Sequence, residues 1–148
     1  MLNFINIGKK DSAIELLKQV KENDYVSFDV KLLNLHLKRL NMILGKNVIK
    51  NNSAYVNLQT LWEIMQDIGT KGQHHFHGLT PENVYEALRT LKDSKDVRIS
   101  YDDRYVIISL AKFGNNTPIA VIIEPNGYIK KINNTAVKIV TIYPYKKK

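Results

Sequence analysis

The second half of this chain alternates apolar and polar residues with a period of two, and short turns interrupt the alternation. Side chains on a strand point to opposite faces in turn, so the alternation predicts half-buried β-strands. Turns as short as Asp102-Asp103 or Pro125-Asn126-Gly127 join antiparallel neighbours. We therefore expect a twisted antiparallel sheet of four or five strands. The expected strands cover residues 97–101, 105–112, 118–124, 128–133 and 136–143.

The first half of the chain favours helices instead. Apolar residues recur at helical spacing over residues 11–22, 27–44 and 53–68. The third of these helices is expected to start either at the Ser53 cap or near Asn57. Gly45 and Gly69 follow the second and third of these segments, where glycine is suited to close a helix. The pattern predicts three N-terminal helices.

A further helix is expected to begin at Thr80. Thr80 is a good N-cap residue, Pro81 suits the first helical position, and Glu82 places a negative charge in the first turn. The predicted fold class is therefore α+β. A helical N-terminal segment, residues 1–70, precedes a basic α+β domain, residues 71–148, in which one helix leads into the antiparallel sheet.

The net charge of +8 is unevenly distributed. Residues 1–70 hold 9 Lys and Arg against 7 Asp and Glu, whereas residues 71–148 hold 13 against 7. The excess therefore lies in the half that is predicted to form the sheet. A basic surface attracts the phosphate backbone of a nucleic acid, which makes RNA a candidate partner. A solvated basic surface without a partner has the same composition.

The sequence lacks the features of several protein classes. It has no cysteine, and so no disulfide, thiolate nucleophile or cysteine zinc site. The N-terminus has no basic region before a long apolar stretch, so we expect no signal peptide. The longest wholly apolar run, residues 119–123, is far too short to cross a bilayer. We expect a cytoplasmic protein with no membrane partner.

Three of the four histidines, His74, His75 and His77, lie within four residues where the two halves meet. Histidine exchanges protons near neutral pH, so this cluster is the best active-site candidate in the chain. In an extended segment His75 and His77 face the same way, which suits an acid and a base. Zinc binding is disfavoured because no HExxH or cysteine pattern is present. A polar loop with incidental histidines is the alternative. We expect no metal and no cofactor.

The last predicted strand carries a second candidate group, Thr141, Tyr143 and Tyr145. On a strand these three hydroxyls point the same way. They are suited to hold a phosphate, and the phenol rings can stack on a base. Thr and Tyr are also common in strands, so the alternative is that these three residues only stabilise the strand. Basic residues on or beside the same sheet that can bind phosphate are Arg98, Arg104, Lys130, Lys131 and Lys138.

The downstream half also has an ordered set of motifs. These are His77-Gly78-Leu79-Thr80-Pro81-Glu82-Asn83-Val84, preceded by the other histidines, then Arg98-Ile99-Ser100, paired strands at 105–108 and 117–123, Lys131-Ile132-Asn133-Asn134, and Val140-Thr141-Ile142-Tyr143. Over roughly residues 73–145 this order resembles the phage and mobile-element branch of the barnase–EndoU–colicin–RelE nucleases. Such domains occur as toxins, often at the C-terminus of phage head-morphogenesis and other polymorphic toxin proteins.

The resemblance implies a metal-independent endoribonuclease that uses the 2′-hydroxyl of RNA as its nucleophile. A histidine stands before the first helix in such domains, and His74, His75 and His77 compete for that place. Thr141 and Tyr143 match the pair on the last strand. The resemblance further implies RNA-binding roles for Arg98 and Ser100 on the first strand and for Lys131 and Asn133 ahead of the last strand. Tyr145, from the alternation of the last strand, is a further candidate for RNA binding.

The resemblance also implies a partner. A toxin of this type needs a small acidic immunity or antitoxin protein that covers its cleft. The alternative function is a non-catalytic nucleic-acid-binding or phage structural module that uses the same basic sheet. The convergence of the histidines with Thr141 and Tyr143 in one place would favour the enzyme over the binding module.

Overall fold

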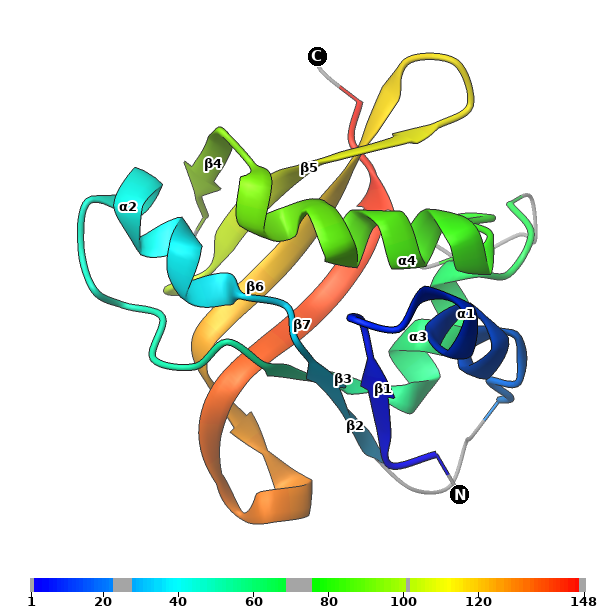
Figure 1. Ribbon diagram of the computed structural model, residues 1–148, viewed down its shortest axis with the longest axis horizontal. Helices are drawn as coiled ribbons and strands as arrows, with labels where there is room; N and C mark the ends of the chain where they lie inside the picture. Colours follow the sequence, from blue (N-terminus) through cyan, green and yellow to red (C-terminus); the bar gives the residue numbers. More distant parts are fainter. Residues whose placement is uncertain (1, 23–27, 69–75, 101, 147–148) are drawn as a thin grey trace.

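The computed structural model describes residues 2–22, 28–68, 76–100 and 102–146. Across these residues seven strands form one mixed sheet in the order β1-β2-β3-β7-β6-β5-β4 (Figure 1). The strands are β1 (Phe4–Asn6), β2 (Asp29–Leu33), β3 (Ala54–Asn57), β4 (Asp96–Ile99), β5 (Tyr105–Phe113), β6 (Thr117–Ile129) and β7 (Asn134–Pro144). The α-helices are α1 (Lys10–Lys18), α2 (Leu40–Leu44), α3 (Leu58–Ile64) and α4 (Pro81–Thr90).

The prediction of an antiparallel sheet with four or five strands is wrong. Strands β4 to β7 do pair antiparallel in chain order, but β3 pairs with β7 in parallel and β1 pairs with β2 in parallel. The N-terminal part supplies three of the strands, so it is not the helical segment that the apolar spacing suggested. Strands from both halves of the chain therefore belong to one sheet.

The helix expected over residues 27–44 is divided into a strand and two short helical turns. In β2, Val30 and Leu32 are fully buried, which is the period-two burial of a strand and not a helical stripe. Asn34 and His36 then adopt positive φ values of 62° and 53°, which no α-helix can accommodate. The segment ends in the 3-10 turn η1 (Leu37–Arg39) and the five residues of α2, which Gly45 closes with a φ of 71°.

The helix expected over residues 53–68 starts at the later of its two expected positions, near Asn57, and not at Ser53. Its first residues form β3, and the helix α3 starts only after Asn57, whose side chain accepts a hydrogen bond from the Gln59 N–H at 2.8 Å. The helix expected after Thr80 is confirmed as α4. The Thr80 hydroxyl accepts from the Asn83 N–H, and the Asn83 side chain accepts from the Thr80 N–H, both at 3.0 Å.

Pro125-Asn126-Gly127 is not a turn. Strand β6 continues through it as a bulge in the pairing with β7, and the chain reverses later, in the 3-10 turn η3 (Lys130–Ile132). A Cβ on Gly127 would lie 2.7 Å from the Cβ of Lys138. The glycine is therefore needed for the close approach of two strands, not for a reversal.

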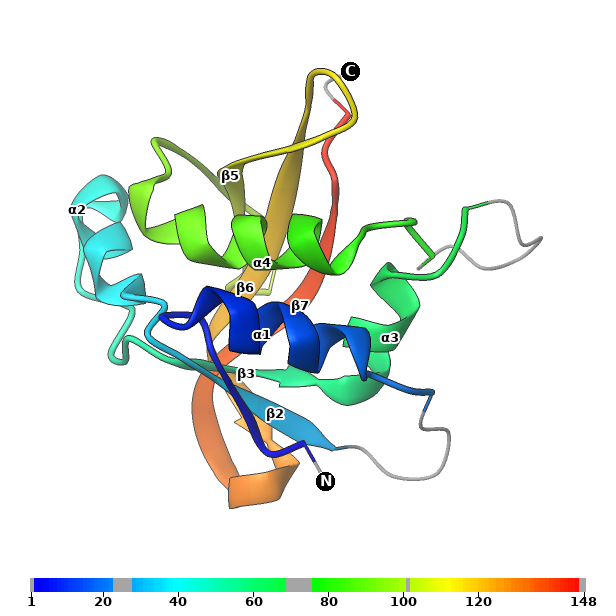
Figure 2. The same ribbon diagram turned by 45° about the vertical axis from the view of Figure 1, so that its right-hand side comes forward.

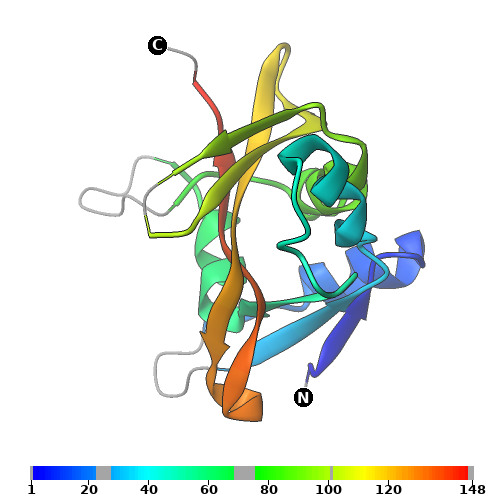
Figure 3. The same cartoon turned by 90° about the vertical axis from the view of Figure 1, so that its left-hand side faces the viewer.

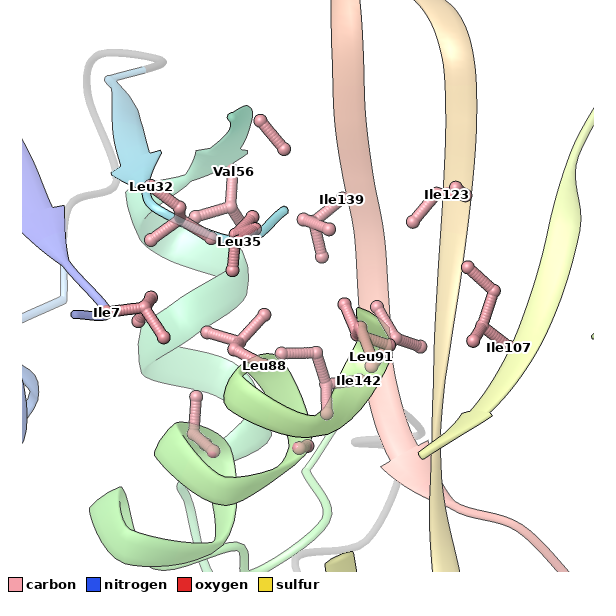
Figure 4. Packing of buried hydrophobic residues seen from close by; sticks show 14 of the residues in the cluster. Ile7, Leu32, Leu35, Val56, Leu88, Leu91, Ile107, Ile123, Ile139 and Ile142 are labelled. Atoms are coloured by element: carbon pink, nitrogen blue, oxygen red, sulfur yellow. The ribbon is translucent and has the colours of Figure 1, made fainter. Parts of the chain in front are cut away.

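One hydrophobic core lies between the sheet and the helices α1 and α4, which cover the same face (Figure 2). Leu88 of α4 and Leu91, in the 3-10 turn that follows α4, pack there with Ile139 of β7 (Figure 4). Leu32 and Val56 enter the same core from the N-terminal strands. Each such fully buried side chain contributes about 1.5–3 kcal/mol to folding. The N-terminal strands are therefore part of the same core as the C-terminal sheet.

On the side away from β6, strand β7 has two different neighbours. Strand β3 pairs with it only at Lys138 and Ile139, and α3 packs beside the rest (Figure 1). Viewed nearly along the plane of the sheet, α2 and α4 lie on one side of strands β5 to β7 (Figure 3). We call the opposite side of β4–β7 the outer face.

Candidate functional site

The outer face is defined by the pairing register. Residues that pair directly across strands point to the same side, so Arg98, Val106, Ile122 and Thr141 form one row. Asp96, Ile108, Ala120 and Tyr143 form the next row. The residues between them along each strand, such as Ile107, Val121 and Ile142, are fully buried in the core. The outer face therefore carries Arg98, Thr141 and Tyr143 together.

Four side chains on this face form a continuous chain of contacts, which we call the Tyr143 cluster. The ring centre of His77 lies 6.2 Å from that of Tyr143, and Tyr143 lies 6.4 Å from Tyr145. The Arg98 guanidinium lies over the Tyr145 ring at 5.5 Å from its centre. The fold thus brings together one histidine, two phenols and one arginine from three separate segments of the chain.

His77 is positioned by its neighbours in the chain. The Gly78 N–H donates to the Gln66 carbonyl at 2.7 Å, and the Leu79 N–H donates to the Ile64 carbonyl at 3.1 Å. Phe76, on the other side of His77, meets the Trp62 ring edge-on at 5.6 Å. The segment is therefore fixed to the C-terminal end of α3, and the half-buried His77 side chain is held against β7.

Tyr143 is half-buried, and it covers part of the sheet. Ala120, its direct partner in β6, is fully buried although it points away from the core. Burial raises the pKa of the Tyr143 phenol above its ordinary value, and the nearby Tyr145 raises it further. The phenol therefore keeps its proton throughout the neutral range and can donate a hydrogen bond to a phosphate oxygen.

Arg98 is held in place from two sides. Its Nε donates to Asp96 Oδ1 at 3.2 Å, and its guanidinium lies over Tyr145. The hydrogen bond that Arg98 donates to Asp96 raises the pKa of the Arg98 guanidinium, which is already fully protonated at neutral pH. The guanidinium is a fixed positive charge at the end of the Tyr143 cluster.

Arg104, Ser100 and Lys138 lie on the same face in a third row. Arg104 Nε donates to Glu124 Oε1 at 2.9 Å, and Glu124 is the direct partner of Lys138. The Ser100 N–H donates to the Arg104 carbonyl at 2.9 Å. Glu124 compensates part of the positive charge of this row, a feature that the basic composition did not indicate.

Lys131 and Asn133 lie elsewhere, at the η3 turn. The Lys131 N–H donates to Asp29 Oδ2, and its Nζ donates to Asn3 Oδ1, both at 3.4 Å. Asn133 has a φ of 47° and accepts a hydrogen bond from the Tyr128 hydroxyl at 2.6 Å. These contacts give both residues structural roles in the β6–β7 hairpin. His74 and His75 lie outside the described residues.

Sequence reasoning missed two residues next to Lys138. Tyr55 of β3 is the direct partner of Lys138, and Lys31 of β2 is the direct partner of Tyr55. The Lys31 Nζ lies 5.8 Å from the centre of the Tyr55 ring. Period-two spacing in β2 and β3 was the available signal, but the apolar residues of these segments also fit helices.

Among the described residues, no group of three or more His, Cys, Asp or Glu side chains is arranged to hold a metal ion. None of the helices in the described part of the chain is long and apolar enough to cross a bilayer. Comparison with known proteins gives no match to a protein-family model, a curated protein or a solved structure.

Proposed function

We propose that this protein is a metal-independent endoribonuclease of the toxin type, with its active site at the Tyr143 cluster. The observation that carries the proposal is the contact of His77 with Tyr143. Tyr145 and Arg98 continue the same series of contacts on one sheet face. A proton-transfer group, a hydrogen-bond donor and a fixed cation in one place are the requirements for breaking a phosphodiester without a metal.

In the proposed reaction, His77 removes the proton from a ribose 2′-hydroxyl. The 2′-oxygen then attacks the adjacent phosphorus, and the bond from phosphorus to the 5′-oxygen breaks. Tyr143 donates a hydrogen bond to the phosphate, and Arg98 stabilises its growing negative charge. The departing 5′-oxygen takes a proton from a second acid, a role for which His75 is the candidate. The products are a 2′,3′-cyclic phosphate and a 5′-hydroxyl.

The net charge of +8 supports the choice of RNA as substrate, because cationic surfaces bind the phosphate backbone. A ribonuclease of this type acts where RNA is present, in the cytoplasm of a bacterial cell. The cell that makes it needs protection. We infer a small acidic immunity protein that covers the outer face and pairs with Arg98 and its neighbours.

The test is cleavage of total RNA by the purified protein in the presence of EDTA. We compare the wild type with His77→Ala, His75→Ala and a control, His36→Asn. His36 is exposed and has a positive φ that asparagine tolerates. We expect the wild type to leave RNA products with 2′,3′-cyclic phosphate ends. The cleavage rate should fall by about 10²- to 10⁴-fold in His77→Ala and stay unchanged in the control.

The alternative function, a nucleic-acid-binding module without catalysis, is favoured by the stacked Arg98 and Tyr145, which need no histidine to bind RNA. It predicts salt-dependent RNA binding with no cleavage in EDTA or in magnesium. Cleavage that persists unchanged in both His75→Ala and His77→Ala would reject the proposed active site.

A further inference from the structure

A cavity of about 510 Å³ lies beside the Tyr143 cluster. It is formed where the ends of three segments meet: β4, the β5–β6 turn with the start of β6, and the residues that follow β7. Its lining includes Asp96, Arg98, Asn116, Pro118, Tyr145 and Lys146. We propose that this cavity binds one nucleobase next to the phosphodiester that is cut, and that Asn116 reads the edge of that base. This inference rests on the proposed function.

The cavity is in the size range of small-molecule sites, which run from about 300 to 1,000 Å³. Its walls offer two flat groups, the Arg98 guanidinium and the Tyr145 ring, and both kinds of surface stack on bases. The apolar side chains of Ile108 and Pro118 also line it. Flat walls and an apolar lining suit a planar, partly apolar ligand such as a nucleobase.

The walls are fixed before any ligand binds. The Tyr145 N–H donates to the Pro118 carbonyl at 2.8 Å, which extends the strand pairing past the end of β7. Asp96 holds Arg98 through Nε at 3.2 Å. Binding therefore costs little ordering of these side chains, and a preorganised site can discriminate between similar ligands.

Asn116 supplies the means of discrimination. Its amide offers both donors and an acceptor, which match the paired donors and acceptors on the edge of a base. The Asp96 carboxylate, in contrast, is already engaged by Arg98. Lys146 adds a positive charge to the lining, suited to the phosphate that follows the bound base.

The cavity is continuous with the proposed active site. Tyr145 belongs both to the cavity lining and to the Tyr143 cluster, with 6.4 Å between its ring centre and that of Tyr143. A strand whose phosphate lies between His77 and Arg98 therefore places a neighbouring base at the cavity. Base preference at the cut site would originate here.

The test measures binding without cleavage. The ligands are four short single-stranded RNAs that are identical except for the base at one position. Each carries a 2′-O-methyl group at every position, so none has a 2′-hydroxyl nucleophile. We compare the wild type with Asn116→Ala and with Asn115→Ala, a control from the same turn that does not line the cavity. We expect the wild type and the control to prefer one base by about 5- to 100-fold, and Asn116→Ala to lose that preference.

The two proposals can fail separately. Equal affinity of the wild type for all four RNAs, or an unchanged preference in Asn116→Ala, would overturn the base-binding cavity even if unmodified RNA is cleaved. A base preference that depends on Asn116, in a protein that does not cleave unmodified RNA, would leave the cavity standing and reject the ribonuclease. Tyr145→Ala is the second variant, and it should weaken binding of all four RNAs.

Discussion

The Arg98 guanidinium lies 5.5 Å from the centre of the Tyr145 ring, although β4 and β7 are separated by two other strands. The contact forms because Tyr145 continues past β7 along Pro118, and Asp96 orients Arg98. It joins the edge of the sheet to the end of the chain on the outer face.

Replacing Arg98 by alanine should weaken RNA binding and reduce its salt dependence. A side chain that contacts one phosphate contributes about one unit to the slope of log affinity against log salt. We expect the slope, measured by titrations at several salt concentrations, to decrease by about 1. Arg89→Ala is the control, because Arg89 lies on α4 and is paired with Glu86 at 2.7 Å. Equal decreases in both variants would show that the slope depends only on net charge and that Arg98 contacts no phosphate.

Glu124→Gln should strengthen RNA binding. The carboxylate of Glu124 pairs with Arg104 and faces Lys138, so its loss leaves both cations available to phosphate. We expect an increase in affinity of several fold at low salt, which is lost at high salt because surface charges are screened. The matched control is Glu15→Gln on α1, which changes the net charge equally. An equal increase in the control would contradict the prediction.

The Tyr143 phenol should ionise only above the ordinary value of 10.0. Burial, followed by the nearby Tyr145, raises its pKa, so the folded state favours the protonated phenol. This contribution to stability is complete below the unfolded pKa and is lost as the pH rises through the folded pKa. The difference between the ultraviolet titration curves of the wild type and of Tyr143→Phe gives the ionisation of the Tyr143 phenol. A Tyr143 titration below 10.0 would contradict the raised pKa.

Gly127→Ala should destabilise the fold. The new Cβ would lie 2.7 Å from the Cβ of Lys138, so β6 and β7 would have to separate at the bulge. We expect a loss of about 1–3 kcal/mol in the free energy of unfolding, measured with urea. Asn126→Ala, at the exposed neighbouring residue, should change it by less than about 0.5 kcal/mol. Equal stability of Gly127→Ala and the wild type would reject the close approach.

Residues 71–148 alone should not fold. Strand β3 pairs with β7, and the core that α4 covers includes Leu32 and Val56. Removing the N-terminal part exposes this apolar surface and leaves an edge of β7 unpaired. Circular dichroism and urea unfolding of the fragment should show no cooperative transition. A cooperative transition like that of the whole chain would identify residues 71–148 as an independent domain.

The sequence determined those features that depend on local interactions. Thr80 and Asn83 cap α4 through contacts within one turn, and the strands β4 and β5 follow from alternation next to short turns. The alignment of Thr141 and Tyr143 also follows from alternation, because their side chains lie two residues apart on one strand. These predictions required no knowledge of distant partners.

The tertiary structure decided whatever depends on partners far away in the chain. Residues 29–33 and 54–57 have apolar spacings that fit both a helix and a strand, and pairing between β3 and β7 selects the strand. At residues 125–127, a turn sequence is kept extended because Lys138 packs against Gly127. The cavity with Asn116, Arg98 and Tyr145 exists only because three distant segments meet on the outer face. Long-range pairing and packing outweigh local preference at these places, since each residue gains more from its distant contacts than its local propensity costs.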